Sequence, residues 1–295
     1  TGISTLSLPD ALPISNHIAN DLGLDVISAG QVIATAMEWY EQGLLTLEST
    51  GGLALTWGNG DAVVEAVKRI AHREGVGDLL ALGVKRAAER LGAAADMAAL
   101  HVKGLEMPAD GIRASKGEAI VHATSARGAD HLRPYASCID AFGYREAELG
   151  IEGDIDFLKD GDNAWIKPFQ ELSMATNMLG VCLFASITLA VKPSTWARLA
   201  SAAVGYTIGK DDLLRAAERV INLERMINAR FGFDRKDDTL PRRFLEEPAP
   251  DGRGAGEVIN LTLALDSYYA SMGWDIATGL PTAETLTKVG LGWVQ

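Results

Sequence analysis

The stretch Asn177–Phe184 (NMLGVCLF) contains Cys182, one of only two cysteines in a sequence of 295 residues. Gly180 can adopt backbone conformations that other residues avoid, which permits a tight turn and a close approach to a ligand. The apolar neighbours on both sides predict that Cys182 is buried. A buried free thiol is most often a small core residue, and otherwise a single metal ligand whose partners lie elsewhere. Taken alone, the stretch favours the core residue.

A second candidate for chemistry is His131, which lies between Asp130 and Arg133 after a turn that contains a glycine. A histidine beside an arginine and a carboxylate can donate or accept a proton, or bind an anionic cofactor together with the arginine. Arg127 and Arg133 could clamp an anion in the same way. The simpler interpretation of all three residues is an exposed loop with solvated charges.

Other catalytic patterns do not occur in the sequence. It contains no HExxH, no GxSxG, no phosphate-binding loop and no GxGxxG after a predicted strand. His72, His101 and His122 are isolated. Residue types and spacing therefore argue against a zinc enzyme, and they predict no more than a helical protein with a buried cysteine.

The elements that must position these residues are predicted to be helices. Ala and Leu are abundant, and apolar residues repeat at helical spacing in most segments. The clearest helices are expected over residues 28–42, 61–74, 78–91, 166–179, 210–231 and 259–272. Ser28 and Asp61 are the expected caps of the first two. Few segments alternate with period two, so the expected fold class is all-α (mainly α), with two packed helical domains.

The chain is predicted to divide into three parts. Residues 1–15 have no helical or strand period, contain Pro9 and Pro13, and resemble translated sequencing-adapter read-through, so we expect a non-native leader. Residues 16–102 and 103–295 are the two helical domains. The boundary near Val102 follows from the glycines and the proline of the next ten residues or so.

Net charge and cysteine content limit the class of function. A formal net charge of −12 argues against nucleic acid or an anionic membrane as partner, because both require clustered Lys and Arg. No apolar run approaches ~18 residues, so no membrane span is expected. Two cysteines make neither a disulfide framework nor the four thiolates of an iron–sulfur cluster. A reducing cytoplasm is the expected location.

Seven separated segments together resemble the tungsten- or molybdenum-pterin aldehyde ferredoxin oxidoreductase family. The resemblance runs in order through nearly all of residues 16–294, and it is specific because seven separated segments agree. The segments are Asn20–Gly30, Trp57–Gly92, His101–Ala109, Ala123–Arg133, Asn177–Phe184, Gly232–Phe244 and Tyr268–Val294. The resemblance implies that the chain corresponds to the two C-terminal helical domains of that family, without its N-terminal domain.

In that family two Asp-x-x-Gly-Leu-(Asp/Cys) turns grip the two pterins. The resemblance matches them to two stretches of this chain, Asn20–Asp25 and Asn177–Cys182. It thereby implies pterin contacts at Asn20, Gly23, Leu24 and Asp25, and at Asn177, Gly180, Val181 and Cys182. Asn replaces the usual Asp in both turns, and Val181 replaces the usual Leu.

The resemblance also assigns roles to three single residues. Cys182 corresponds to the last ligand of a 4Fe–4S cluster, whose other ligands belong to a C-x-x-C-x-x-x-C run that this sequence lacks. His131 corresponds to the active-site histidine of an R-G-x-C-H-L motif, with Asp130 in place of the cysteine. Arg133 stands where a basic residue can reach a pterin phosphate.

The resemblance implies oxidation of an aldehyde to a carboxylic acid at a tungsten (or molybdenum) bis-pyranopterin. Electrons would leave through the 4Fe–4S cluster to ferredoxin or a similar acceptor, and a homodimer is possible. We expect this chain alone to be inactive. Two alternatives stay open: a benzoyl-CoA-reductase-like reaction on the same fold, which Asp130 motivates, and a helical subunit without a cofactor.

Overall fold

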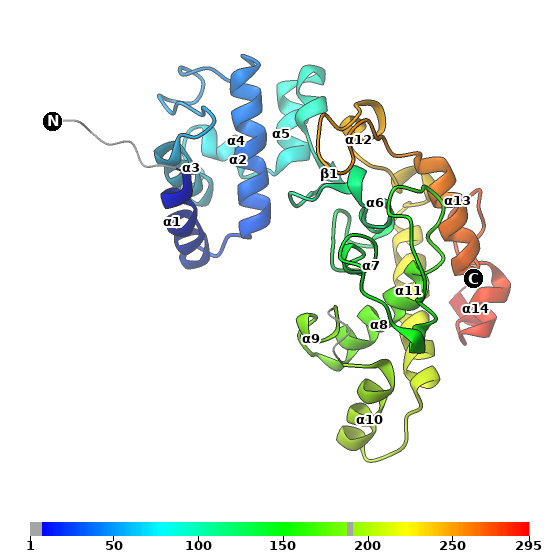
Figure 1. The fold of residues 1–295 in the computed structure, drawn as a ribbon. Helices are drawn as coiled ribbons and strands as arrows, with labels where there is room; N and C mark the ends of the chain where they lie inside the picture. The colour runs from blue at the N-terminus through cyan, green and yellow to red at the C-terminus, as the bar shows by residue number, and fades with distance from the viewer. Residues whose placement is uncertain (1–7, 188–190, 295) are drawn as a thin grey trace. The chain divides into compact units, whose positions relative to one another are not determined.

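The structure is a computed structural model that describes residues 8–187 and 191–294. The described chain forms two compact units (Figure 1). Unit 1 extends to Asp110 and includes Pro241–Arg243, and unit 2 comprises Gly111–Leu240 and the residues from Phe244 onward. Both units are built mainly from helices, as the sequence predicts.

Unit 1 is a group of helices followed by a small hairpin. Its elements are α1 (Leu8–Asp21), α2 (Val26–Glu41), α3 (Gly60–His72), α4 (Val76–Leu80), α5 (Val84–Leu91), the 3-10 helix η1 (Ala93–Ala98), and the strands β1 (His101–Val102) and β2 (Leu105–Glu106). The strands are antiparallel, with His101 opposite Glu106. The core forms where α2 and α3 pack, and its largest side chain is the fully buried Trp39. Trp39 Nε1 donates to the Ala95 carbonyl at 3.0 Å, which satisfies its polar atom.

The hairpin explains why unit 1 ends later than the boundary predicted near Val102. Val102 is fully buried, and the Val84 N–H donates to Glu106 Oε1 at 2.8 Å. The bond to Val84 ties β2 to the start of α5, and unit 1 extends to Asp110.

The expectation that residues 1–15 lack helical structure is wrong for Leu8–Ser15, which form the first part of α1. Ala11 is fully buried and α1 packs along α3. Pro9 lies at the second helical position, where no N–H bond is required, and only Pro13 removes a helical hydrogen bond. Packing against α3 therefore outweighs the local effect of the prolines. Residues 1–7 lie outside the described part of the chain.

Unit 2 contains the longer helices. Its elements are η2 (Ile112–Ala114), α6 (Lys116–Thr124), α7 (Ser137–Asp140), η3 (Ala147–Leu149), α8 (Ile166–Leu179), α9 (Phe184–Ile187), α10 (Pro193–Val204), α11 (Lys210–Arg230), η4 (Arg235–Asp237), α13 (Leu261–Met272), α14 (Ala283–Lys288) and η5 (Gly292–Val294). The short helix α12 (Arg242–Glu246) contains residues assigned to both units.

In unit 2, α8 and α11 lie side by side and α13 packs on α8 (Figure 1). Their inward faces supply Phe169, Leu172, Leu213, Ile221 and Tyr268 to a single apolar core. Two further helices, α6 and α10, contact the same group. None of the helices described here is long and apolar enough to cross a bilayer.

Helix ends show where local sequence was misleading. The helix expected over 78–91 is two helices, α4 and α5, separated at Gly83, whose φ is 80°. The cap of α2 is Asp25, whose carboxylate accepts from the Ser28 N–H at 2.7 Å, so Ser28 is not the cap. Asn59, not Asp61, caps α3. In both cases a good capping side chain stands earlier in the chain than the predicted one.

Candidate functional site

The turn Asp21–Asp25 ends α1 with a left-handed glycine. Gly23 has φ 71°, its N–H donates to the Asn20 carbonyl at 3.2 Å, and the Leu24 N–H donates to the Ala19 carbonyl at 2.8 Å. These bonds satisfy the last carbonyls of α1. Leu24 packs on the core of unit 1, whereas Asn20 and Asp25 are exposed.

The turn after α8 has the same local geometry. Gly180 has φ 67°, its N–H donates to the Asn177 carbonyl at 3.1 Å, and the Val181 N–H donates to the Thr176 carbonyl at 3.2 Å. Val181 packs on the core of unit 2, and Asn177 and Cys182 are exposed. Two stretches that match one motif in sequence therefore also share one backbone conformation.

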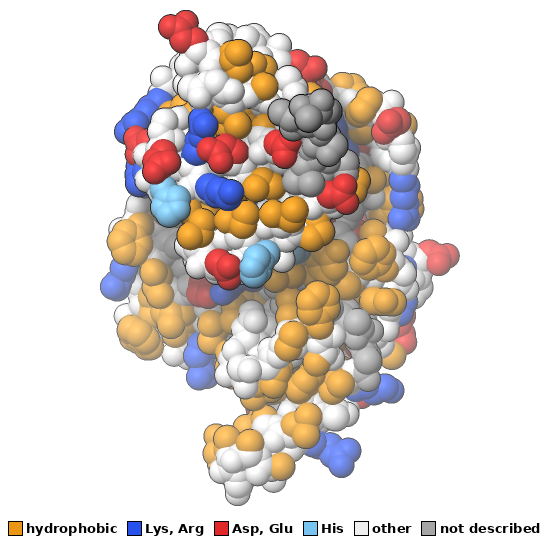
Figure 2. Space-filling model, turned by 90° about the vertical axis from the view of Figure 1, so that its left-hand side faces the viewer, with side chains coloured by type: hydrophobic (Ala, Val, Ile, Leu, Met, Phe, Trp, Pro, Cys, Tyr) orange, Lys and Arg blue, Asp and Glu red, His pale blue; other side chains and the backbone are white. Residues whose placement is uncertain are grey.

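Apolar side chains surround both turns at the surface. Beside the first turn, Leu22, Val26 and Ile27 are 39%, 40% and 46% exposed. Beside the second, Met178 is 44% exposed and Phe184 is 75% exposed. Figure 2 shows one face of the molecule, on which hydrophobic side chains gather among acidic and basic ones.

A pocket of about 550 Å³ in unit 1 opens beside the first turn. Leu24 and Asp25 line it, together with the cationic side chains of Lys85, Arg86 and Lys103. The carboxylates of Glu89 and Glu106 also face the pocket. The volume suits a molecule of cofactor size, and the three cations suit an anionic group such as a phosphate.

Local geometry fixes the far side of this pocket. Lys103 and Gly104 join β1 to β2 with φ values of 52° and 91°, as a two-residue turn between antiparallel strands requires. A left-handed lysine costs ~1 kcal/mol, and strain of this kind gathers at functional sites. Sequence analysis missed Lys85, Arg86 and Lys103, and a non-glycine residue in a two-residue turn was the signal that could have found Lys103.

The prediction that Cys182 is buried is wrong, because its side chain is exposed. Gly180 ends α8 at the surface, and the chain leaves the helix there as a short irregular segment before α9. The buried cysteine is Cys138 on α7, whose pKa is raised to about 12 by burial and by the neighbouring carboxylates of Glu118 and Asp140. Cys182 is therefore the thiol of this chain that is open to solvent.

His131 lies half-buried in the loop between α6 and α7. Its ring meets the ring of Tyr135 edge-on, with 5.7 Å between centroids. Asp130 is buried, and the Arg133 side chain is 24% exposed, so Arg133 is not the solvated loop charge of the simpler interpretation. Arg127 fits that interpretation, because its side chain is 61% exposed. Arg133 Nε lies 3.3 Å from Asp130 Oδ2, and its Nη1 donates to Glu224 Oε1 on α11 at 2.8 Å.

Arg133 of the histidine loop and Asn177 of the second turn line one small cavity. The sequence placed these two residues in separate parts of the predicted site. Its water-accessible volume is about 20 Å³, which is enough for one water molecule. The Ser173 hydroxyl on α8 donates to the Leu132 carbonyl at 3.1 Å and ties the loop to the same helix. The loop of His131 and the helix that ends at Gly180 thus pack together in unit 2.

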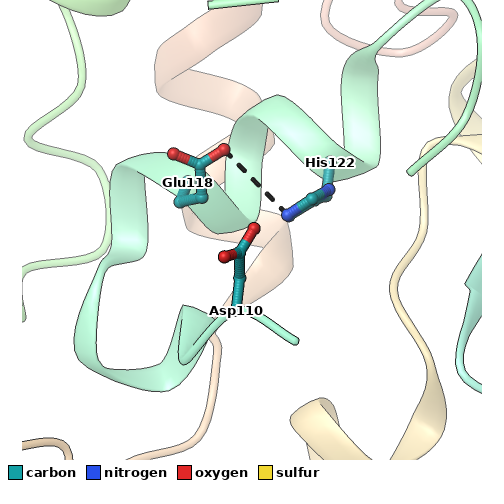
Figure 3. Close-up of side chains that lie close together, drawn as sticks. All are labelled: Asp110, Glu118 and His122. Carbon is teal, nitrogen blue, oxygen red and sulfur yellow. Dashed lines mark ion pairs between the residues drawn. The ribbon is translucent and has the colours of Figure 1, made fainter. Parts of the chain in front are cut away.

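Sequence analysis treated His122 as isolated and missed its partner. Glu118 and His122 lie one turn apart on α6, both fully buried, with His122 Nε2 4.0 Å from Glu118 Oε1 (Figure 3). Glu118 Oε2 accepts from the Ser137 N–H at 2.7 Å. The i, i+4 spacing of Glu and His was the available signal.

Comparison with known families shows which family contains a chain with these turns and this fold. Residues 5–291 match the family described as aldehyde ferredoxin oxidoreductase, domains 2 and 3. The chain belongs to the aldehyde ferredoxin oxidoreductase family. It is 36% identical over 279 residues to the tungsten-containing aldehyde ferredoxin oxidoreductase of Pyrococcus furiosus, which covers 94% of this chain and 44% of that protein.

Two more similarities broaden the comparison. The aliphatic sulfonate oxidoreductase, WOR-like subunit, of Pyrococcus furiosus is 29% identical and covers 96% of this chain and 43% of that protein. The solved active-site complex BamBC of benzoyl-coenzyme A reductase with 1,5-dienoyl-CoA has a TM-score of 0.70 at 23% identity, over 94% of this chain and 45% of that chain. This structural similarity shows that the chain and the reductase complex share a fold. The chain spans less than half the length of these relatives.

Both family turns offer groups that fit a pterin. Each presents exposed polar side chains beside a left-handed glycine that leaves the backbone open, and neither Gly23 nor Gly180 has a neighbouring atom within 4 Å of an added Cβ. For a 4Fe–4S cluster the fit is one ligand of four, because Cys182 is exposed and Cys138 is enclosed in the core.

Proposed function

We propose that this chain forms the pterin-binding helical part of a tungsten-containing enzyme that oxidises aldehydes to carboxylic acids. The observation that carries the proposal is the pair of matching helix-ending turns, the first of which lines a pocket with three cationic side chains. Membership of the aldehyde ferredoxin oxidoreductase family supplies the reaction class. Molybdenum is the alternative metal.

We assign one pterin to the first turn and the other to the second. Asn20, Gly23, Leu24 and Asp25 would hold the first through side-chain and backbone polar groups, and Lys85, Arg86 and Lys103 would bind its phosphate. In the second turn the corresponding groups are Asn177, Gly180, Val181 and Cys182. When bound, a tungsten bis-pyranopterin supplies the two-electron oxidation of the aldehyde.

The remaining residues of the site handle electrons and protons. The Cys182 thiolate would supply one of the four ligands of a 4Fe–4S cluster that passes electrons to ferredoxin or a similar acceptor. His131 would accept or donate a proton at its imidazole and orient the substrate carbonyl. Arg133 is held by Asp130 and Glu224, so reaching a pterin phosphate would require it to exchange one of these partners.

A second candidate is a different reaction on the same fold. Asp130 stands where the family motif has cysteine, three residues before Arg133, and this changes the charge beside the proposed active-site histidine. The aliphatic sulfonate oxidoreductase subunit is similar to this chain in sequence, and the benzoyl-coenzyme A reductase complex shares its fold. We also propose that the complete enzyme pairs with a second copy and uses neither nucleic acid nor a membrane as partner.

A substrate screen on a joined enzyme tests the proposal. Residues 8–294, which include all of α1, would replace only the segment of the Pyrococcus furiosus tungsten enzyme that they match, so that the rest of that enzyme supplies the cluster cysteines this chain lacks. Circular dichroism would check the folding. We expect aldehyde-dependent reduction of ferredoxin or a viologen dye, and no reduction from this chain alone. A folded, tungsten-loaded joined enzyme that oxidises no aldehyde but acts on a sulfonate or a thioester of coenzyme A would support the second candidate.

A further inference from the structure

Asp130 is the centre of a buried polar cluster that surrounds the backbone of His131. Its Oδ1 accepts from the Leu132 N–H at 2.9 Å, and its Oδ2 accepts from Arg127 Nη1 at 3.1 Å. The same Oδ2 lies 3.3 Å from Arg133 Nε. The Asp130 side chain is 7% exposed and that of Arg133 is 24% exposed, so the contact between them is largely shielded from water and salt, whereas the Arg127 side chain is 61% exposed.

The cluster continues from the loop to α11 through Arg133. Arg133 Nη1 donates to both oxygens of Glu224, at 2.8 and 3.0 Å. Arg133 therefore bridges two carboxylates, one in the loop and one on the longest helix of unit 2. Each of these contacts joins opposite charges in a partly buried setting, where a hydrogen bond is stronger than in water.

Backbone contacts hold the two ends of the same loop. The Leu132 carbonyl accepts from Ser173 on α8, and the Ala126 carbonyl accepts from Asn228 Nδ2 on α11 at 2.9 Å. The peptide group after His131 and the carbonyl of Leu132 are thus both bonded to fixed partners. The imidazole itself meets the Tyr135 ring edge-on.

We propose that Asp130 is a positioning residue that fixes His131 by binding the Leu132 N–H and Arg133. The inference rests on the role of His131 in the proposed function. A cysteine at this position has one weak acceptor and cannot bind an N–H and two guanidinium groups together. The carboxylate thus makes this loop depend on ion pairs where the family motif has a neutral side chain.

Three variants of the 295-residue chain test the positioning. Asp130→Ala removes both the charge and the acceptor, Asp130→Asn keeps one acceptor oxygen for the Leu132 N–H, and Asp234→Asn is a matched control at an exposed aspartate of unit 2. NMR would follow amide exchange at Leu132 and the nuclear Overhauser effect between the His131 and Tyr135 rings, with five histidines to assign.

In Asp130→Ala we expect amide exchange at Leu132 to rise by at least about tenfold and the ring contact to weaken, because the bond that protects this amide is lost. Amide exchange at Leu132 should rise less in Asp130→Asn, and in Asp234→Asn both the exchange and the ring contact should match the wild type. Wild-type exchange and ring contact in Asp130→Ala would overturn the proposal. If that variant does not fold, Asp130→Cys decides by the same two readouts.

The kinetics of the joined enzyme separate this proposal from the function on which it rests. Asp130→Ala should lower kcat more than it raises KM, because a misplaced proton donor or acceptor affects the reaction step more than binding. A changed NMR result with unchanged kcat would contradict the role of His131 and leave the positioning by Asp130 supported. Unchanged NMR with lowered kcat would contradict the positioning.

Discussion

At the scale of single residues, the environments of the two cysteines differ most from what the sequence indicated. Apolar neighbours predicted a buried Cys182, but the chain leaves α8 at Gly180 and exposes the thiol. Cys138, which has no motif around it, is 2% exposed. Apolar neighbours in sequence predict that a residue is buried only if the helix or loop that contains it is known. Here Cys182 is exposed because α8 ends before it.

Thiol labelling checks this difference directly. With iodoacetamide or a disulfide reagent at pH 8, we expect the native chain to label at Cys182 and not at Cys138, because burial raises the pKa of Cys138 to about 12 and blocks access. Mass spectrometry of the native and unfolded chain would count the labels. Labelling of native Cys182→Ser would contradict the assignment of the buried thiol.

The buried carboxyl of Asp140 makes stability depend on pH. Burial raises its pKa from 3.8 to about 6, against hydrogen bonds from Ser115 and the Gly117 N–H that lower it. Between these two pH values the folded chain holds a proton that the unfolded chain has released, so the free energy of unfolding falls as pH rises, by up to ~3 kcal/mol from this group.

Asp140→Asn should remove that dependence. Urea unfolding from pH 4 to pH 6.5 should show the variant gaining stability relative to the wild type as pH rises. Asp234→Asn serves as the control, because hydrogen bonding to Lys236 lowers the pKa of Asp234 and moves its effect to the acid side of pH 4. A constant difference between Asp140→Asn and the wild type across this range would show that Asp140 titrates normally.

At the scale of elements, long amphipathic helices were predictable and their ends were not. The predicted bounds of α8 are those observed, and α11 ends at Arg230, one residue earlier than expected. Their apolar stripes face one core, which is the signal that periodicity reports. At the split between α4 and α5, Gly83 has a left-handed φ and the next N–H, that of Val84, donates to Glu106 Oε1. Glu106 lies 22 residues further along the chain, so no local pattern contains that contact.

Alanine at the two turn glycines tests whether the turns are pre-formed in this chain. Gly23→Ala and Gly180→Ala should each lower the free energy of unfolding by ~1–2 kcal/mol, because both φ values are positive while no atom obstructs the methyl group. Gly30→Ala on α2 is the control: its φ is ordinary and its surroundings are open, so stability should rise by ~0.5–1 kcal/mol. Equal effects at all three positions would show that the turns are not left-handed.

At the scale of the whole molecule, the family resemblance predicted two helical bodies, and the structure has two compact units with separate cores. The resemblance also selected the two turns, which share a backbone conformation. Composition could not show the pocket beside the first turn, because its cations come from α5 and from the β-hairpin and meet only in the folded unit. Unit 2 is closed by a buried ion pair between Arg225 and Asp238, with 2.7 Å between Arg225 Nη2 and Asp238 Oδ2.

Loss of this ion pair should weaken unit 2 strongly. Arg225→Met should lower the free energy of unfolding by about 3–5 kcal/mol, because Asp238 is fully buried and would keep an unpaired charge. Lys236→Met removes an exposed ion pair with Asp234 and should leave the unfolding midpoint unchanged. Similar midpoints for the two variants in a urea titration would contradict the buried pair.

The tungsten content of the joined enzyme tests the central proposal most directly. Mass spectrometric metal analysis would compare the wild type with a variant in which Lys85, Arg86 and Lys103 are each changed to Glu, and with Lys68→Glu, an exposed lysine of α3 outside the pocket. We predict tungsten in the wild type and in Lys68→Glu, and a loss of at least about tenfold in the folded triple variant, because three phosphate contacts become repulsive. Equal tungsten in all three proteins, or none in a folded wild type, would contradict pterin binding at this pocket.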